Sequence, residues 1–299
     1  MDPQPALLSS ERTKINVVKG LIRELRPKQW TKNLLVFASA MFAGTLLEPE
    51  NLLRTMIAFV AFSFMSSAIY IINDIMDVEK DRLHPDKCHR PIASGVVSIP
   101  LGIVTATILA GLSIIASLIV NIYLTGILLV YFLLNLSYSL HLKHIVLIDV
   151  MVIAAGFVLR ATAGAAAVDG HLTSWFVLCT MLLSLFLALG KRRHELELFE
   201  DQPDKRRKVL DHYSVKLLDQ LMVIVTGLTI MFYALYAASE DQRMMWSVPF
   251  VIYGVFRYYY LIHMKNAGGK PEEVLLTDKH ILITVVLFGI VVIYIKQFS

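Results

Sequence analysis

The sequence predicts an all-α polytopic membrane protein with nine transmembrane helices in one bundle. Of its 299 residues, 56% are hydrophobic and only 17% are charged. The mean hydropathy of +0.62 is too high for an ordinary soluble protein. Nine apolar runs follow residue 33, and Lys and Arg gather in alternate connections between them. Apolar runs with alternating positive charge are typical of a multi-span helical protein.

The first 20 residues are predicted to be a disordered tail, because Pro3, Pro5 and a Ser pair interrupt any apolar periodicity. Residues 21–32 mix Leu, Ile and Trp with Arg and Lys, which predicts an amphipathic helix on the membrane surface. A plain interfacial anchor with Trp30 at headgroup level explains most of this segment. No apolar core with a cleavage site precedes it, so we expect no signal peptide.

The rest of the chain, residues 21–299, is predicted to be a single membrane domain. Most of its apolar runs approach the ~20 residues that span a bilayer. The expected spans are 33–48, 52–74, 99–121, 123–141, 145–168, 173–190, 216–238, 244–264 and 279–297. Cys88 falls in a charged loop and Cys179 in an apolar run, so no disulfide is expected.

The distribution of positive charge predicts the orientation of the chain. Of the 28 Lys and Arg residues, 23 fall before the first span or in the connections after spans two, four, six and eight. On the other side are only Arg54, Arg243 and Lys296, while Arg160 and Arg257 lie within spans. Cytoplasmic connections carry such an excess. We therefore expect a plasma-membrane protein with a cytoplasmic N-terminus and an outside C-terminus.

A polar stripe at the end of the second span is the most informative stretch. If the helix continues, Asp74, Asp77 and Asp81 share one face, and Tyr70 and Asn73 begin the stripe one turn earlier. Three carboxylates at the rim of a bilayer repel one another and are costly to desolvate. Mg²⁺ removes that repulsion and prefers such oxygen ligands. The stripe therefore predicts a metal site, with a solvated helix end as the alternative.

The loop after this stripe carries Lys87, His89 and Arg90. Cations beside a metal–carboxylate cluster are expected to bind a polyphosphate, because the metal bridges phosphate oxygens and basic side chains neutralise the rest. Cytoplasmic loops are commonly basic, so any one of these residues is also explained without a ligand.

Spans four and five carry ionisable and polar groups near the same mouth. Tyr138 ends span four and Lys143 follows it. Asp149 and Arg160 are eleven residues apart, so they face one way, and such groups usually face the bundle interior. Asp149 is expected to pair with Lys143 or Arg160, and a purely structural ion pair stays open. Arg160, which is deeper, is the candidate for binding a buried anion, whereas Arg257 in span eight is ambiguous.

The sixth span ends in a basic sequence. Lys191 and Glu195 share a face at i,i+4, and Lys191 and Arg192 are near enough to the span to reach a phosphate. The basic run 205–208 is expected to be solvated or to contact anionic lipid. Whether the loop 265–279 covers the site stays open.

The motif N-D-x-x-D-x-x-x-D from Asn73 to Asp81, followed by R-P-I-x-x-G from Arg90 to Gly95, resembles the UbiA superfamily of intramembrane prenyltransferases. The resemblance covers nearly the whole chain and implies a UbiA-type bundle with a cytoplasmic active-site mouth. Ordinary members carry a second acidic motif after span six, but this chain has G-K-R-R-H-E at 190–195. This basic motif, together with R-P-K-Q-W-x-K-N before span one, is similar to the pattern in members of the superfamily that transfer phosphoribose.

The resemblance implies transfer of 5-phosphoribose from phosphoribosyl pyrophosphate to a polyprenyl phosphate such as decaprenyl phosphate, in cell-envelope arabinan synthesis. It implies Mg²⁺ as the cofactor, held by Asn73, Asp74, Asp77 and Asp81, with the three aspartates as the catalytic groups. The implied substrate contacts are Lys28, Tyr70, Lys87, His89, Arg90, Tyr138, Lys143, Arg160, Lys191, Arg192 and Glu195.

Such a reaction needs no catalytic His or Cys pair, because the lipid phosphate is already an anion and can attack ribose C1 without a general base. Two other functions compete with this one. A prenyltransferase that joins a prenyl diphosphate to an aromatic acceptor is disfavoured by the missing acidic motif. A transporter is disfavoured because inverted repeats and broken spans are not seen. The expected partners are the two substrates and membrane lipids, not nucleic acid, and a homo-oligomer is compatible with the sequence.

Overall fold

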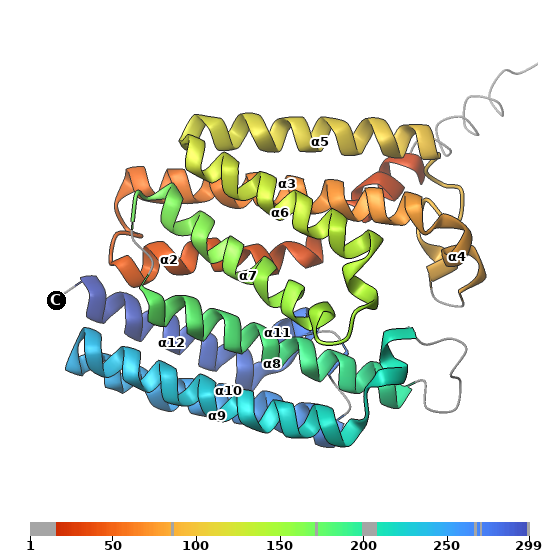
Figure 1. Cartoon of the computed structure of the whole chain (residues 1–299). Coiled ribbons are helices and arrows are strands. Elements are labelled where there is room, and N and C mark those ends of the chain that lie inside the picture. The colour runs from red at the N-terminus through yellow and green to blue at the C-terminus, as the bar shows by residue number, and fades with distance from the viewer. Residues whose placement is uncertain are drawn as a thin grey trace, which may run out of the picture.

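The computed structural model describes residues 16–84, 87–170, 173–198, 208–265, 268–269 and 271–297, and these residues are helical without a strand (Figure 1). The α-helices are α2 (Leu35–Ala43), α3 (Pro49–Met76), α4 (Val78–Leu83), α5 (Ile99–Val120), α6 (Ile122–Leu140), α7 (Ile148–Ala167), α8 (Ser174–Leu198), α9 (Val215–Glu240), α10 (Val248–Lys265), α11 (Pro271–Thr277) and α12 (Lys279–Gln297). Short 3-10 helices are η1 (Pro27–Leu34), η2 (Lys87–His89), η3 (Leu142–His144), η5 (Lys208–His212) and η6 (Gln242–Ser247).

The predicted all-α membrane fold is confirmed, but the count of nine crossings is not. Within the described residues, seven helices are long and apolar enough to cross a membrane: α3, α5, α6, α7, α8, α9 and α12. The expected span 33–48 contains the nine-residue α2, with η1 before it. The expected span 244–264 contains η6 followed by the 18-residue α10.

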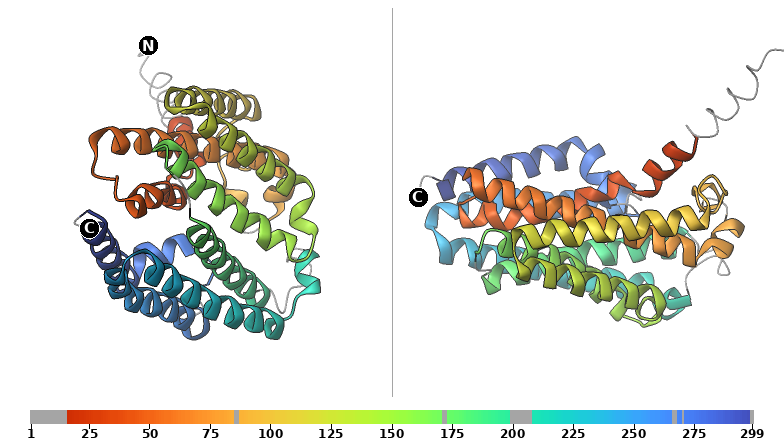
Figure 2. Two further views of the ribbon diagram at one scale, coloured as in Figure 1. Left: turned by 60° about the vertical axis from the view of Figure 1, so that its left-hand side comes forward. Right: turned by 90° about the horizontal axis from the view of Figure 1, so that it is seen from above.

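The long helices run side by side in one bundle, and their connections gather at its two ends (Figures 1 and 2). One end carries α4, η2, η3, η5 and α11, and we call it the α4 end. Apolar clusters fill the space between helices: one joins α2, α3, α6 and α7, and another joins α7, α8, α9 and α10. The polar connections are therefore concentrated at the ends of an apolar bundle.

The short helix α2 is held to α7 through backbone contacts. A Cβ atom on Gly164 would lie 2.0 Å from the carbonyl oxygen of Val36, so only glycine permits this approach. The Ser39 hydroxyl donates to the carbonyl of Ala161 at 2.6 Å, within the same seam. Small residues allow such close packing between membrane helices.

The N-terminal segment differs from the single surface helix expected over 21–32. Residues 16–24 are helical, although the disordered tail was expected to reach residue 20, and residues 1–15 lie outside the described part. The helix stops where Arg26 takes a left-handed conformation (φ 49°) before Pro27, which starts η1. The indole of Trp30 donates to Ser67 of α3 at 3.1 Å. The N-terminal segment therefore packs on the bundle through its contact with α3.

Candidate functional site

The polar stripe lies at the α4 end, where α3 stops. Asp77 caps α3 in a non-helical conformation (φ −97°, ψ 8°), and α4 starts at the next residue. The backbone N–H of Asp77 still donates to the carbonyl of Asn73 at 2.9 Å, and that of Asp81 to Asp77 at 2.8 Å. The stripe therefore stays close to helical spacing across the break. Asp74 and Asp81 are buried, whereas the Asp77 side chain is 35% exposed.

Two arginines compensate the buried acids. Arg90 Nη1 donates to Asp74 Oδ1 at 2.9 Å and to Asp81 Oδ2 at 2.6 Å, so one guanidinium bridges both carboxylates. Arg26 donates to the other oxygen of Asp74 and stacks over Tyr70, with its Cζ 4.9 Å from the ring centre. These two guanidinium groups offset part of the repulsion between the buried carboxylates.

Glu24 is a further buried carboxylate in this cluster. Its Oε1 accepts from the backbone N–H of Ile92 at 2.9 Å, and its side chain shares a hydrogen bond with Asp74. Burial, and then the nearby charge of Asp74, raise the pKa of Glu24 to about 7. Sequence reasoning missed this residue. The available signal was that Glu24 is the sole acid between Glu11 and Glu48 in a basic stretch.

Asp77 faces a different set of groups. Lys143 Nζ of η3 lies 3.8 Å from Asp77 Oδ2, and Lys80 Nζ lies 4.0 Å from Oδ1. Asn73, one turn earlier, is half-buried. Both contacts of Asp77 are longer than an ordinary charged hydrogen bond. Its carboxylate therefore sits between cations without a tight partner among them.

The predicted metal ligands do not form a closed site in the described residues. No group of three or more His, Cys, Asp or Glu side chains is arranged there to hold a metal ion. Asn73 and Asp77 offer carbonyl and carboxylate oxygens, which suit Mg²⁺. Asp74 and Asp81 offer the same atom type but are bonded to arginine. The chemistry of the donors fits Mg²⁺, and the site stays a prediction.

A second polar network connects α6, α7 and α8 at this end. Arg192 Nε donates to Asp149 Oδ2 at 2.6 Å, and the two side chains are 1% and 0% exposed. The same guanidinium donates to Glu195 at 2.8 Å and to the Tyr138 hydroxyl at 3.1 Å. The Tyr213 hydroxyl donates to Asp149 at 2.7 Å. Burial, followed by this bond, raises the pKa of Tyr213 to about 12.

This network corrects the pairing expected for Asp149. Lys143 pairs with Asp77 instead, and Arg160 lies deeper in the bundle, so neither reaches the Asp149 carboxylate. Sequence spacing placed Asp149 and Arg160 on one face of α7 but could not reveal Arg192, which comes from the next helix. Arg192 is held by the carboxylates of Asp149 and Glu195 and donates to the Tyr138 hydroxyl.

Arg160 is buried, and within the described residues its hydrogen-bond partners include no carboxylate. It donates to Asn33 Oδ1 at 2.7 Å, to the Gly156 carbonyl at 2.8 Å and to the Tyr131 hydroxyl at 2.7 Å. Its Cζ also lies 4.8 Å from the centre of the Tyr131 ring. Arg257, which the sequence left ambiguous, forms an ion pair with Asp278 at 2.8 Å. Among the described residues, the hydrogen-bond acceptors of Arg160 are thus neutral groups inside the bundle.

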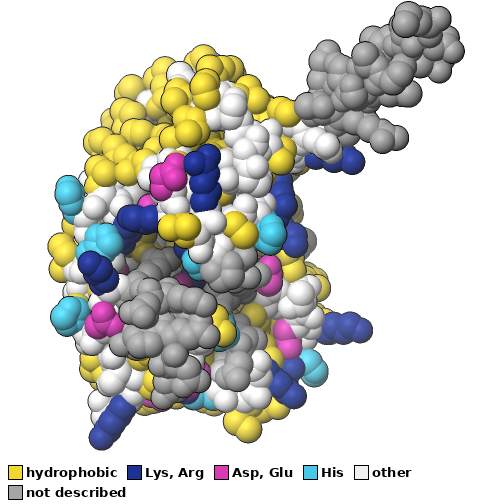
Figure 3. All heavy atoms as spheres, turned by 90° about the vertical axis from the view of Figure 1, so that its right-hand side faces the viewer, with side chains coloured by type: hydrophobic (Ala, Val, Ile, Leu, Met, Phe, Trp, Pro, Cys, Tyr) yellow, Lys and Arg dark blue, Asp and Glu magenta, His cyan; other side chains and the backbone are white. Residues whose placement is uncertain are grey.

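The remaining predicted residues also lie on the segments of the α4 end. Lys28 and His89 are exposed, and Lys87 and Lys191 are half-buried. Charged side chains gather on this end of the molecule, and hydrophobic side chains cover the adjoining flank (Figure 3). Helix α11 of the loop 265–279 packs against η1, while residues 266, 267 and 270 lie outside the described part, as do 205–207 of the basic run.

Comparisons with known proteins agree with this arrangement. The decaprenyl-phosphate phosphoribosyltransferase of Mycolicibacterium smegmatis is 38% identical over 88% of both chains. The protein of that name from Corynebacterium glutamicum is 38% identical over 88% of this chain and 82% of its own. A UbiA homologue from Archaeoglobus fulgidus, solved with GPP and Mg²⁺ bound, has a TM-score of 0.74 at 18% identity, covering 94% of this chain and all of that one. The sequence model of the UbiA prenyltransferase family matches residues 34–276, so this chain belongs to that family.

Proposed function

We propose that the protein transfers 5-phosphoribose from phosphoribosyl pyrophosphate to a polyprenyl phosphate and releases pyrophosphate. The observation that carries the proposal is the 38% identity, over most of both chains, to two proteins named for this transfer onto decaprenyl phosphate. The α4 end supports it, because acids and cations from α3, α4, η2 and η3 converge there beside an apolar bundle.

Mg²⁺ fits the donor's pyrophosphate at Asn73 and Asp77, with Asp74 and Asp81 completing the set of oxygen donors. When bound, the ion supplies Lewis-acid stabilisation of the leaving pyrophosphate. Asp77 suits this role best, because its neighbouring ammonium groups lie at 3.8 and 4.0 Å and leave its oxygens loosely held. Hard oxygen donors with places left for phosphate are the usual way proteins bind Mg²⁺.

The chain's own cations hold the donor in place. Arg90 and Lys143 flank the acids, so they neutralise phosphate oxygens that the carboxylates would otherwise repel. Lys28, Lys87 and His89 extend this positive lining outward. Tyr138, whose hydroxyl accepts from Arg192, is the candidate contact for the ribose.

The acceptor supplies its own nucleophile. A phosphate monoester is an anion at neutral pH, so its oxygen attacks ribose C1 as the bond from C1 to pyrophosphate breaks. We assign the attraction of that phosphate to Lys191 of α8 or to the deeper Arg160. Preorganised cations of this kind stabilise developing charge without a proton transfer.

The positive charge at the α4 end supports a cytoplasmic position for this end, on the side where the water-soluble phosphoribosyl pyrophosphate is available. The protein then sits in the plasma membrane with the N-terminus inside and feeds the synthesis of arabinan precursors for the cell envelope.

The test is a donor swap with purified protein. Labelled phosphoribosyl pyrophosphate plus a polyprenyl phosphate should yield a labelled lipid, whereas a prenyl diphosphate plus an aromatic acid should yield no product. Chelation should abolish the first reaction and Mg²⁺ should restore it. Asp77→Ala should lower the rate by at least about 10²-fold, because the loss of one group that stabilises transition-state charge typically costs about this much. Glu79→Ala is the matched control, because this acid of the same segment is exposed and forms its ion pair with Arg82. A normal rate in Asp77→Ala would refute the metal assignment.

A further inference from the structure

The helix at residues 16–24 packs on the loop that follows η2. We call residues 90–97 of this loop the R-P-I loop, after its motif. A Cβ atom on Gly20 would lie 2.9 Å from the side chain of Val96 and 3.1 Å from that of Val97. The N-terminal helix and the R-P-I loop are therefore in direct contact at Gly20.

Glu24 forms a second contact between them, four residues after Gly20 and so on the same face of the helix. Its side chain is 2% exposed, and Oε1 accepts from the backbone N–H of Ile92 at 2.9 Å. Ile92 is itself buried. A buried backbone N–H needs a partner, because an unpaired donor away from water is costly. Glu24 therefore fixes the backbone of the R-P-I loop at Ile92.

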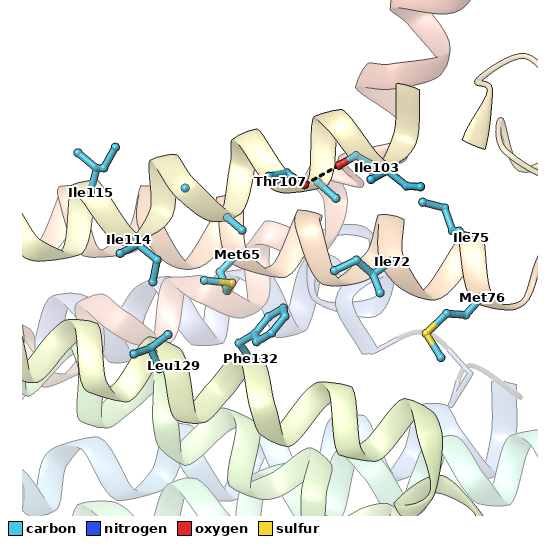
Figure 4. A pocket seen from close by; sticks show the side chains of 13 residues that line it. Met65, Ile72, Ile75, Met76, Ile103, Thr107, Ile114, Ile115, Leu129 and Phe132 are labelled. Atoms are coloured by element: carbon cyan, nitrogen blue, oxygen red, sulfur yellow. Dashed lines mark hydrogen bonds between the residues drawn. The ribbon is translucent and has the colours of Figure 1, made fainter. Parts of the chain in front are cut away.

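Apolar packing holds the other side of Ile92. Its side chain belongs to one cluster with Ile71 of α3 and Val97. A Cβ atom on Gly102 of α5 would lie 3.2 Å from Ile75 and 3.4 Å from Ile92. The side chain of Ile75 extends from α3 toward α5 (Figure 4). The R-P-I loop thus lies between α3 and α5 on one side and the N-terminal helix on the other.

The position of this loop decides where the Arg90 guanidinium lies. Arg90 is two residues before Ile92, and its Nη1 donates to Asp74 at 2.9 Å and to Asp81 at 2.6 Å. The Glu24 side chain also shares a hydrogen bond with Asp74. Glu24 therefore contacts both the loop that carries Arg90 and one of the acids that Arg90 binds.

We propose that Glu24 is a positioning residue, which acts through Ile92 and Asp74 to hold the Arg90 guanidinium where it binds a phosphate of the donor. The inference rests on the proposed function for the identity of that donor. An apolar residue at position 24 would leave the Ile92 N–H without its acceptor. A glutamine would keep an acceptor for Ile92 and supply a donor for Asp74.

Transfer kinetics of the full-length protein test this role. Glu24→Leu should raise the KM for phosphoribosyl pyrophosphate at least about tenfold, which corresponds to about 1.4 kcal/mol. The KM for polyprenyl phosphate should stay unchanged. Glu24→Gln should keep the wild-type KM for both substrates. A wild-type donor KM in Glu24→Leu, or an equal loss in Glu24→Gln, would overturn the proposal.

Asn121→Leu is the matched control for a loss of stability alone. The Asn121 side chain also accepts from a backbone N–H, that of Leu124 at 2.8 Å, but it lies between α5 and α6 at the opposite end of the bundle. This variant should have a lower Tm and an unchanged KM for each substrate. A rise in its donor KM equal to that of Glu24→Leu would refute the positioning role.

Gly20→Leu perturbs the same contact without changing a polar group, and it replaces Glu24→Leu if that variant does not fold. The leucine side chain must displace Val96 and Val97. The donor KM should therefore rise while the KM for polyprenyl phosphate stays unchanged. A wild-type donor KM in Gly20→Leu would count against the proposal.

Hydrogen exchange, measured by mass spectrometry in nanodiscs, tests the contact without turnover. Peptides that contain Ile92 should exchange faster in Glu24→Leu than in the wild type or in Glu24→Gln. Unchanged exchange in Glu24→Leu would overturn the proposal.

The two proposals fail separately. A wild-type protein that transfers no phosphoribose would refute the proposed function, and faster exchange in Glu24→Leu would still support the contact of Glu24 with the R-P-I loop. Phosphoribose transfer with a wild-type donor KM in Glu24→Leu would refute the positioning role alone.

Discussion

Removing Asp149 should test whether the Arg192 network stabilises the fold. Both side chains of the pair are buried, at 0% and 1% exposure, and their contact is 2.6 Å. Asp149→Ala leaves Arg192 with Glu195 and also removes the acceptor of the Tyr213 hydroxyl. Breaking a buried pair on one side costs about 3–5 kcal/mol, because a charge stays behind without its partner. We expect a loss of this size in the free energy of unfolding.

Thermal unfolding of the detergent-purified protein, followed by tryptophan fluorescence, measures this loss. Arg54→Ala is the control, because Arg54 makes two ion pairs of 2.7 Å at the opposite end with partners that are 75% and 68% exposed. Exposed pairs contribute about 0–1 kcal/mol. The apolar double variant Asp149→Leu with Arg192→Met should recover most of the stability but not the activity, since Tyr138 loses its donor. Equal Tm values for Asp149→Ala and Arg54→Ala would refute the reasoning.

Three further predictions concern other parts of the chain. Asp74→Ala should lower the free energy of unfolding by about 1.5–3 kcal/mol, because it removes charged hydrogen bonds from two arginines. Glu79→Ala should leave the stability unchanged, and equal Tm values for the two variants would contradict the prediction. Gly164→Ala should cost about 1–3 kcal/mol or more by overpacking against α2, whereas Gly227→Ala, with open space, should be tolerated; the Tm of each variant checks this. The bond from Arg257 lowers the pKa of Asp278 below 3.8. The Arg257–Asp278 ion pair therefore contributes to the free energy of unfolding above that pH, and this contribution is lost as the pH falls through the pKa of Asp278 in the folded protein. Asp278→Asn keeps a helix cap but loses the charge, so its Tm deficit at pH 7 should disappear in acid; a deficit independent of pH would contradict this.

The long helices could be predicted from sequence because lipid demands a continuous apolar run. The runs 99–121 and 279–297 match α5 and α12 to within a residue. The first run was less informative. Its polar start, with Asn33 fully buried, belongs to η1, and only nine residues of it form α2. Hydropathy does not show that Asn33 is buried against a distant arginine rather than exposed at an interface.

The site could be located from the sequence, but its partners could not. The acids of α3 stand out because ionisable groups are costly at a membrane rim. Arg90, which was predicted, is near in sequence, but other counter-ions come from distant segments. Arg26 is 48 residues before Asp74 of α3, and Arg192 of α8 is 43 residues after Asp149 of α7. Spacing along one helix reports only neighbours on that helix. Glu24 was missed for the same reason, since its burial depends on the loop that carries Ile92.

The seam between α2 and α7 has a consequence for biogenesis. Helix α2 has nine residues, too few to cross a bilayer alone, and its close contact is with a helix that the ribosome makes more than 100 residues later. Its final placement must therefore wait until α7 has emerged. A segment that is made before α3 thus takes its final place only after α7, so the order of placement in this part of the chain differs from the order of synthesis.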